Sequence, residues 1–259
     1  LIISFSIAAT LCSADEASPT AQLKSEIPPV FAAKAESFDY VRRTEMIPMR
    51  DGTKLYTVIL IPRGARRAPI LLTRTPYDAD ERITQKQSKH LSAVLGNKDV
   101  AEELVLDGGY IRVIQDIRGK HHSEGDYVMT RPLRGPLNPT NVDHSTDTYD
   151  TVDWLVKNIP ESNGKVGILG ISYDGFTALM ALFHPHPALR AAMPINPMVD
   201  GWMGDDWSHN GAFRQLSLAY WYDQEATRQS KEKWWSDHFI DIHDSTGGRF
   251  GQASENIGI

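Results

Sequence analysis

One segment constrains the fold of this chain more than any other: Gly-Ile-Ser-Tyr-Asp-Gly at residues 170–175. The apolar run at 166–169 predicts a buried strand before it, and the apolar residues at 176–182 predict a helix after it. A serine between two glycines on a sharp strand-to-helix turn presents its hydroxyl in a strained, exposed position. We therefore predict that Ser172 is a nucleophile. The alternative is a serine that only caps the helix.

The rest of the chain predicts an α/β protein in which strands and helices alternate. Strands are expected at 41–48, 55–62, 69–73, 111–114, 166–169 and 191–193, with a turn at Asp51-Gly52 between the first two. Helical spacing predicts helices at 99–106, 147–158 and 175–183. Such alternation implies a parallel sheet with right-handed crossovers. Together with the turn around Ser172, it predicts an α/β-hydrolase fold over residues 38–199.

Residues 200–259 differ from this core. The strand pattern stops at residue 200, and aromatic and acidic residues at helical spacing dominate 213–239. We interpret 200–259 as the start of a helical cap.

The N-terminal residues also differ in composition. Residues 1–11 are almost all apolar or small and three small residues follow, which is typical of the end of a secretory signal peptide at 1–14. The run is too short to span a bilayer as a helix, and the alternative is a buried N-terminal strand. Residues 15–37 are rich in Ala, Ser, Pro and charge and predict a loosely ordered arm. Cys12 is the only cysteine, so the mature chain has no disulfide, which is compatible with a periplasmic or secreted bacterial protein.

The charge balance disfavours one class of partner. The net charge is −6, and the longest basic blocks are the pairs Arg42-Arg43 and Arg66-Arg67. Binding to nucleic acid requires a concentrated basic surface, so no nucleic-acid partner is expected. We also expect no metal, no cofactor and no membrane attachment after removal of the signal.

A serine nucleophile that attacks a carbonyl needs donors for the oxyanion that forms. The backbone N–H of Tyr173, directly after the nucleophile, predicts one donor. The second donor in such folds comes from the loop after the third strand, which here is Arg-Thr-Pro-Tyr-Asp at 74–78. The phenol of Tyr77 is therefore a candidate, with simple packing of the ring as the alternative.

Several segments resemble the X-Pro dipeptidyl-peptidase and cocaine-esterase-like hydrolases, and among these the α-amino acid ester hydrolases. The similar segments are 74–77, 115–119, 123–132, 170–175, 197–207 and 211–215. They occur in the order typical of the family and cover roughly residues 38–238. The resemblance implies that Tyr77 supplies the side-chain donor of the oxyanion hole and Tyr173 the backbone donor.

The resemblance also implies a substrate. The family hydrolyses esters of α-amino acids and transfers the acyl group to β-lactam nuclei, and a carboxylate cluster holds the α-ammonium of the substrate. Asp206 matches one member of that cluster, and Trp202 or Trp207 could add a cation–π contact. The alternative for Asp205 and Asp206 is a helix N-cap with first-turn charge.

A serine nucleophile also needs a base and a carboxylate that orients it, which follow it in chain order in this fold. No buried parallel strand is expected after 191–193. His184 and His186 lie at the end of the helix after the nucleophile, and His209 is retained only as a weak candidate for the base. The resemblance places the acid, the histidine and the rest of the carboxylate cluster beyond residue 259. We therefore expect an N-terminal piece of a longer enzyme, inactive alone and homo-oligomeric at full length.

Four polar residues after the fourth predicted strand are expected to have structural roles and no catalytic ones. We expect Asp116 and Arg118 to form an ion pair, and we expect His121 and His122 to lie in a polar loop.

The function expected from these observations is a serine hydrolase that cleaves esters or amides of α-amino acids through an acyl-enzyme. An X-Pro dipeptidyl peptidase or a general carboxylesterase is the alternative among enzymes. A non-catalytic α/β module is the alternative outside them.

Overall fold

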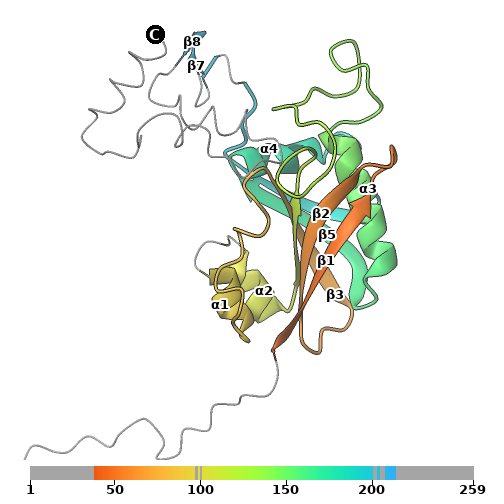
Figure 1. Ribbon diagram of the computed structural model, residues 1–259, viewed down its shortest axis with the longest axis vertical. Helices are drawn as coiled ribbons and strands as arrows, with labels where there is room; N and C mark the ends of the chain where they lie inside the picture. The colour runs from red at the N-terminus through yellow and green to blue at the C-terminus, as the bar shows by residue number, and fades with distance from the viewer. Residues whose placement is uncertain (1–37, 97–98, 100, 201–202, 205–207, 214–259) are drawn as a thin grey trace, which may run out of the picture. The chain divides into compact units, whose positions relative to one another are not determined.

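The structure, a computed structural model, describes residues 38–96, 99, 101–200, 203–204 and 208–213 (Figure 1). Its strands are β1 (Tyr40–Pro48), β2 (Lys54–Pro62), β3 (Ala68–Thr75), β4 (Ile111–Asp116), β5 (Ser162–Ile171), β6 (Leu189–Ile195), β7 (Ser208–His209) and β8 (Ala212–Phe213). Its helices are α1 (Leu91–Leu95), α2 (Glu102–Gly108), α3 (His144–Asn158) and α4 (Tyr173–Met180). The strands predicted from residue 41 to residue 193 are all confirmed, with slightly different ends.

The main sheet has six strands in the order β1-β2-β4-β3-β5-β6. β3, β4, β5 and β6 pair in parallel, as predicted, whereas β1 pairs antiparallel with β2 and β2 antiparallel with β4. Gly52, in the predicted turn between β1 and β2, has φ of 85°, a conformation that glycine adopts without strain. Because the parallel strands share a direction, the loops after β3, β4 and β5 leave the same edge of the sheet. Open α/β sheets form their sites at this edge.

Alternating side chains along the strands divide the core between the two faces of the sheet. Leu72 and Ile168 belong to a cluster completed by apolar residues of α3 and α4. Leu71 and Leu169, one residue away in each strand, belong to a second cluster completed by apolar residues of α1 and α2. Figure 1 shows α1 and α2 on the opposite side of the sheet from α3. Helices on both faces of a largely parallel sheet confirm the α/β class predicted from the sequence.

Helix α3 begins three residues before its predicted start, because Asp143 caps it. The Asp143 carboxylate accepts a hydrogen bond of 2.7 Å from the N–H of Thr146, and the Thr146 hydroxyl accepts one of 2.8 Å from the N–H of Asp143. The first turn, His-Ser-Thr-Asp-Thr, is polar yet buried. Apolar periodicity therefore gave no sign of it.

The structure differs from the prediction at two short elements. Helix α1 was not predicted, since five residues are too few to show a periodic pattern. Residues 208–213 were predicted to hold no strand, but Ser208 pairs with Phe213 and His209 with Ala212 in an antiparallel hairpin, which corrects that prediction. The helix predicted at 213–239 lies outside the described residues, apart from Phe213 itself.

Candidate active site

Ser172 lies between β5 and α4, at the edge where the parallel strands end. Its backbone has φ of 60° and ψ of −119°, a conformation that non-glycine residues rarely adopt. Ser172 occupies the N-cap position of α4, but its side chain makes no capping hydrogen bond. The structure therefore gives no support to a purely capping serine, and the Oγ is available for chemistry.

The two glycines that flank Ser172 are required by close backbone contacts. A Cβ placed on Gly170 would lie 2.4 Å from atoms of Asp174, and one placed on Gly175 would lie 2.4 Å from the carbonyl oxygen of Ile195. Real side chains essentially never show such distances. The glycine spacing that marked this segment in the sequence therefore follows from the packing of the turn against its own helix and against β6.

Tyr173 is the first residue of α4, so its N–H is among those that the hydrogen bonds of the helix do not use. Its ring is fully buried and meets the rings of His144 and Phe176 edge to face, at 6.2 and 5.5 Å between centroids. Its hydroxyl accepts a hydrogen bond of 3.1 Å from the N–H of Thr130. These contacts fix the residue whose backbone was predicted to donate to the oxyanion.

Tyr77 follows β3 and shares a cavity with Ser172. The two residues line one hollow of about 520 Å³, together with Arg82 and Asp174. Two contacts hold the turn that carries the phenol: the N–H of Tyr77 donates to the Thr75 hydroxyl at 3.1 Å, and the carbonyl of Pro76 lies 2.7 Å from Nε2 of His121. The structure thus brings the predicted nucleophile and the predicted side-chain donor together.

A second cavity, of about 550 Å³, meets Ser172 from the segment after β6. Residues 196–200 and Gly204 line it with Ile171 and Ser172. Asp206, predicted to bind the α-ammonium, lies outside the described residues, as do Asp205, Trp202 and Trp207.

No histidine in the described part of the chain lines either cavity with Ser172. His184 is exposed, His186 faces Asp153 at 3.4 Å, and His209 is an exposed residue of β7. Among the described residues, none of these three histidines therefore reaches the cavities that contain Ser172.

The predicted ion pair between Asp116 and Arg118 is wrong. The Asp116 carboxylate is fully buried at the end of β4, where it accepts hydrogen bonds from the N–H groups of Ala79, at 2.6 Å, and His122, at 3.3 Å. Burial raises the pKa of Asp116 from 3.8 to about 7. Asp116 therefore binds the backbone of the loop that carries Tyr77 and does not pair with Arg118.

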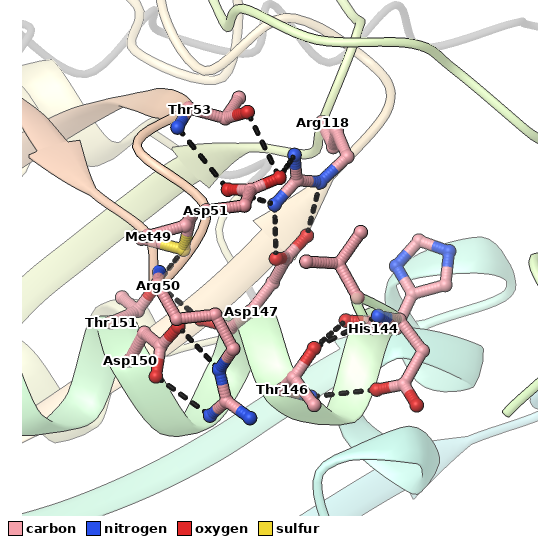
Figure 2. Close-up of polar contacts among 12 residues, drawn as sticks. Met49, Arg50, Asp51, Thr53, Arg118, His144, Thr146, Asp147, Asp150 and Thr151 are labelled. Atoms are coloured by element: carbon pink, nitrogen blue, oxygen red, sulfur yellow. Dashed lines mark hydrogen bonds and ion pairs between the residues drawn. The ribbon is translucent and has the colours of Figure 1, made fainter. Parts of the chain in front are cut away.

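Arg118 turns instead toward the first turn of α3 and the β1–β2 turn (Figure 2). Its guanidinium donates to Asp147 at 2.7 and 3.1 Å and to Asp51 at 2.7 and 3.3 Å. Arg118 and Asp147 are buried, whereas Asp51 is partly exposed. Burial alone would lower the pKa of Arg118, but the hydrogen bonds and charges of Asp147 and Asp51 together raise it. Arg118 therefore pairs with Asp147 and Asp51, and not with Asp116 as predicted.

Arg82 and Asp174 also line the cavity, and no role for either was predicted from the sequence. Arg82, in the loop after Tyr77, donates through Nη2 to Oδ2 of Asp174 at 2.6 Å, and its Cζ lies 5.0 Å from the centroid of the Tyr77 ring. Asp174 lies within the glycine motif, where only its neighbours were given a role. Its position two residues after Ser172, at the start of a helix facing the site, was the signal that could have singled it out.

The described residues contain no group of three or more His, Cys, Asp or Glu side chains arranged to hold a metal ion. None of their helices combines the length and the hydropathy needed to cross a membrane.

The chain is similar to known proteins in sequence and in fold. The family profile of the X-Pro dipeptidyl-peptidase (S15 family) matches residues 51–241, most of the chain. The chain belongs to this S15 family. The resemblance predicted from the sequence motifs is therefore confirmed, and so is the α/β-hydrolase fold.

Several individual proteins are similar to this chain. The chain is 51% identical to an α-amino acid ester hydrolase, with a TM-score of 0.71, and 53% identical to an aminopeptidase from a marine sediment Thaumarchaeota archaeon, with a TM-score of 0.75. Each comparison covers 93% of this chain and 39% of the solved one. The cocaine esterase of Rhodococcus sp. (strain MB1 Bresler) is 32% identical over 177 residues, which are 68% of this chain and 27% of the esterase. The chain thus spans well under half the length of these relatives.

Proposed function

We propose that this chain supplies the nucleophile and the oxyanion hole of a serine hydrolase that acts on esters and amides of α-amino acids. The observation that carries the proposal is the position of Ser172, on a strained turn at the start of α4 and in one cavity with Tyr77. In this reaction Oγ of Ser172 attacks the carbonyl carbon. The oxyanion then accepts hydrogen bonds from the Tyr173 N–H and the Tyr77 hydroxyl. The base takes the Ser172 proton and passes it to the leaving group as the ester or amide bond breaks, which gives an acyl-enzyme and an alcohol or amine. Water then attacks the acyl-enzyme and releases the acid.

The substrate class is supported by the two similar solved proteins. One is an α-amino acid ester hydrolase and the other an aminopeptidase, and both names specify an α-amino group beside the scissile carbonyl. We assign the ammonium of this group to Asp206, the residue that the family resemblance matches to the ammonium-binding carboxylate cluster. A carboxylate in a partly dry pocket would attract this cation strongly. Transfer of the acyl group to an amine, such as that of a β-lactam nucleus, uses the same acyl-enzyme and belongs to the proposal.

The base that activates Ser172 and its orienting acid are proposed to lie beyond residue 259. This part of the proposal has a direct test. The 259-residue chain and a form extended through any coding sequence that continues after Ile259 are assayed with the p-nitrophenyl ester of phenylglycine. The extended form is expected to give a burst followed by turnover, and the 259-residue chain no turnover. Equal turnover by both forms would place the base within residues 1–259.

Two substitutions in the extended form test the residue roles. Ser172→Ala is expected to abolish the burst, and a persistent burst would refute the nucleophile. Asp206→Asn is expected to weaken turnover of the phenylglycine ester by roughly 10-fold or more, on the scale of a lost charge interaction. The matched ester without the amino group should be affected by less than about 2-fold. An equal loss for both esters would contradict the ammonium role.

The aminopeptidase similarity makes amide cleavage a second candidate, with the X-Pro dipeptidyl peptidase and the general carboxylesterase as further alternatives. Phenylglycine p-nitroanilide, Gly-Pro p-nitroanilide and p-nitrophenyl acetate separate these classes by their kcat/KM values. A preference for the Gly-Pro substrate would favour the dipeptidyl peptidase. A preference for the acetate would favour the carboxylesterase. An extended form that forms no adduct with any of them would favour a non-catalytic module.

A further inference from the structure

The loop between β3 and α1 carries Tyr77 and is held to the sheet by polar contacts beyond those to its first turn. The Asp80 carboxylate accepts hydrogen bonds from Arg42 at 2.7 Å and from the Tyr56 hydroxyl at 3.1 Å. The N–H of Ala79 donates to Asp116 at 2.6 Å. These contacts fix the backbone of the loop against β1, β2 and β4. The Tyr77 ring itself packs against the apolar cluster to which Tyr173 and Phe176 of α4 belong.

Arg82 adds a polar connection between the Tyr77 ring and the nucleophile helix. One end of its guanidinium donates to Asp174 at 2.6 Å, and its Cζ lies 5.0 Å from the centroid of the Tyr77 ring. Asp174 lies two residues after Ser172, on α4. A continuous path of contacts therefore runs from the nucleophile helix through Asp174 and Arg82 to the face of the phenol ring. All four side chains line the same cavity.

The Asp174 end of this path is rigid. Its side chain is 5% exposed, and its backbone packs where a Cβ on Gly170 would stand, so the residue has little room to shift. Burial raises the pKa of Asp174 to about 6, against the opposing effects of Arg82 and Arg112 and with a smaller contribution from Asp99. At pH 8 the carboxyl group is therefore ionised, and it holds the Arg82 cation.

We propose that Arg82 is a positioning residue for the oxyanion hole: paired with Asp174, it holds the Tyr77 ring in register with Ser172. The inference rests on the proposed function, in which Tyr77 donates to the oxyanion. A cation on the ring face also favours negative charge on the phenol oxygen as its proton is shared with the oxyanion. Because the oxyanion develops only in the transition state, the effect belongs to kcat and not to KM.

A double-mutant cycle in the extended form tests the inference at pH 8 with the phenylglycine ester. Tyr77→Phe is expected to lower kcat by about 10²- to 10³-fold, as removal of an oxyanion donor does. Arg82→Met is expected to lower kcat by roughly 10- to 100-fold, somewhat less than loss of the donor itself. KM should stay within about 3-fold, since ground-state binding is unchanged. In the Tyr77→Phe background, Arg82→Met is expected to have little further effect, because the group on which it acts is gone.

Arg42→Met is the matched control. It removes the ion pair to Asp80 of the same loop, whereas Arg82 pairs with Asp174 of α4; the Arg42 side chain is 30% exposed and that of Arg82 35%. It should change kcat by less than about 3-fold, as surface pairs contribute little. Arg82→Lys keeps the cation and is expected to recover part of the loss. If Arg82→Met does not fold, Arg82→Lys in both Tyr77 backgrounds completes the cycle.

Tyr77→Phe with unchanged kcat would refute the donor role in the proposed function, and the inference with it. A large effect of Tyr77→Phe with independent, multiplying effects of Arg82→Met would overturn the inference alone. So would a rise in KM at constant kcat, which would instead assign Arg82 to substrate binding. An equal loss in Arg42→Met would reduce the role of Arg82 to anchoring of the loop.

Discussion

The backbone N–H of Ser172 donates a hydrogen bond of 3.0 Å to the carbonyl oxygen of Ile195. Ile195 is the last residue of β6, so this bond fixes the turn with the nucleophile to the neighbouring strand. The same carbonyl is the atom that a Cβ on Gly175 would meet at 2.4 Å. The strained conformation of Ser172 is thus maintained by the strand beside it as well as by its own helix.

Gly175→Ala tests this packing. The added methyl group would clash with the Ile195 carbonyl, and a backbone atom cannot move aside cheaply. We expect a loss of roughly 2 kcal/mol or more in the free energy of unfolding, measured by urea denaturation. Gly135→Ala is the control, since its Cβ would meet only one atom, the Leu133 carbonyl oxygen at 3.9 Å. Equal stabilities of the two variants would contradict the packing described for the turn.

The strain at Ser172 can be measured in the same way. Glycine adopts a φ of 60° at no steric cost, whereas alanine keeps the Cβ that serine has. Neither variant has a hydroxyl, so their difference reports the backbone alone. Ser172→Gly is expected to be more stable than Ser172→Ala by about 1–2 kcal/mol. A Ser172→Gly protein no more stable than Ser172→Ala would show that the turn stores no strain.

Two arginines that reach α3 provide a contrast between buried and exposed ion pairs (Figure 2). Arg118→Gln leaves the buried Asp147 without its bidentate partner, and we expect a loss of about 3–5 kcal/mol. Arg50→Gln removes a pair to Asp150 whose arginine is 35% exposed, and we expect a loss of less than about 1 kcal/mol. Denaturation at low and moderate salt measures both. A smaller loss for Arg118→Gln than for Arg50→Gln would contradict the role assigned to Arg118.

His144 predicts a pH dependence of stability. Burial lowers the pKa of His144 well below 6.5, and neither ring nitrogen has a hydrogen-bond partner among the described residues. Below pH 6.5 the unfolded chain binds a proton that the folded one does not, so this residue lowers stability as the pH falls, by up to about 1.4 kcal/mol per pH unit.

His144→Phe removes this effect while keeping the ring contacts to Tyr173 and Phe176. The variant is expected to lose less stability than the parent between pH 6.5 and 5, in thermal unfolding at several pH values. The exposed His184, changed to Phe, serves as the control. Identical pH slopes for the parent and His144→Phe would show that His144 is protonated in the folded chain.

The strands and helices with a local pattern of apolar residues could be predicted from the sequence. Features that depend on contacts between distant residues could not. The runs that became β3 and β5 are apolar on both faces, as buried parallel strands are. The glycines around Ser172 marked a turn whose need for glycine is steric. In contrast, Asp116 and Arg118 are two residues apart in sequence, yet their partners lie in loop 76–82, the β1–β2 turn and α3. Arg82 likewise gained a role only when the fold placed it between Tyr77 and Asp174.

Covalent labelling shows whether Ser172 is the nucleophile. The extended form is treated with a fluorophosphonate, and the adduct is located by mass spectrometry of its peptides. We expect one phosphonyl group per chain, on Ser172, and no adduct in Ser172→Ala. An adduct on another residue, or one that persists in Ser172→Ala, would contradict this assignment.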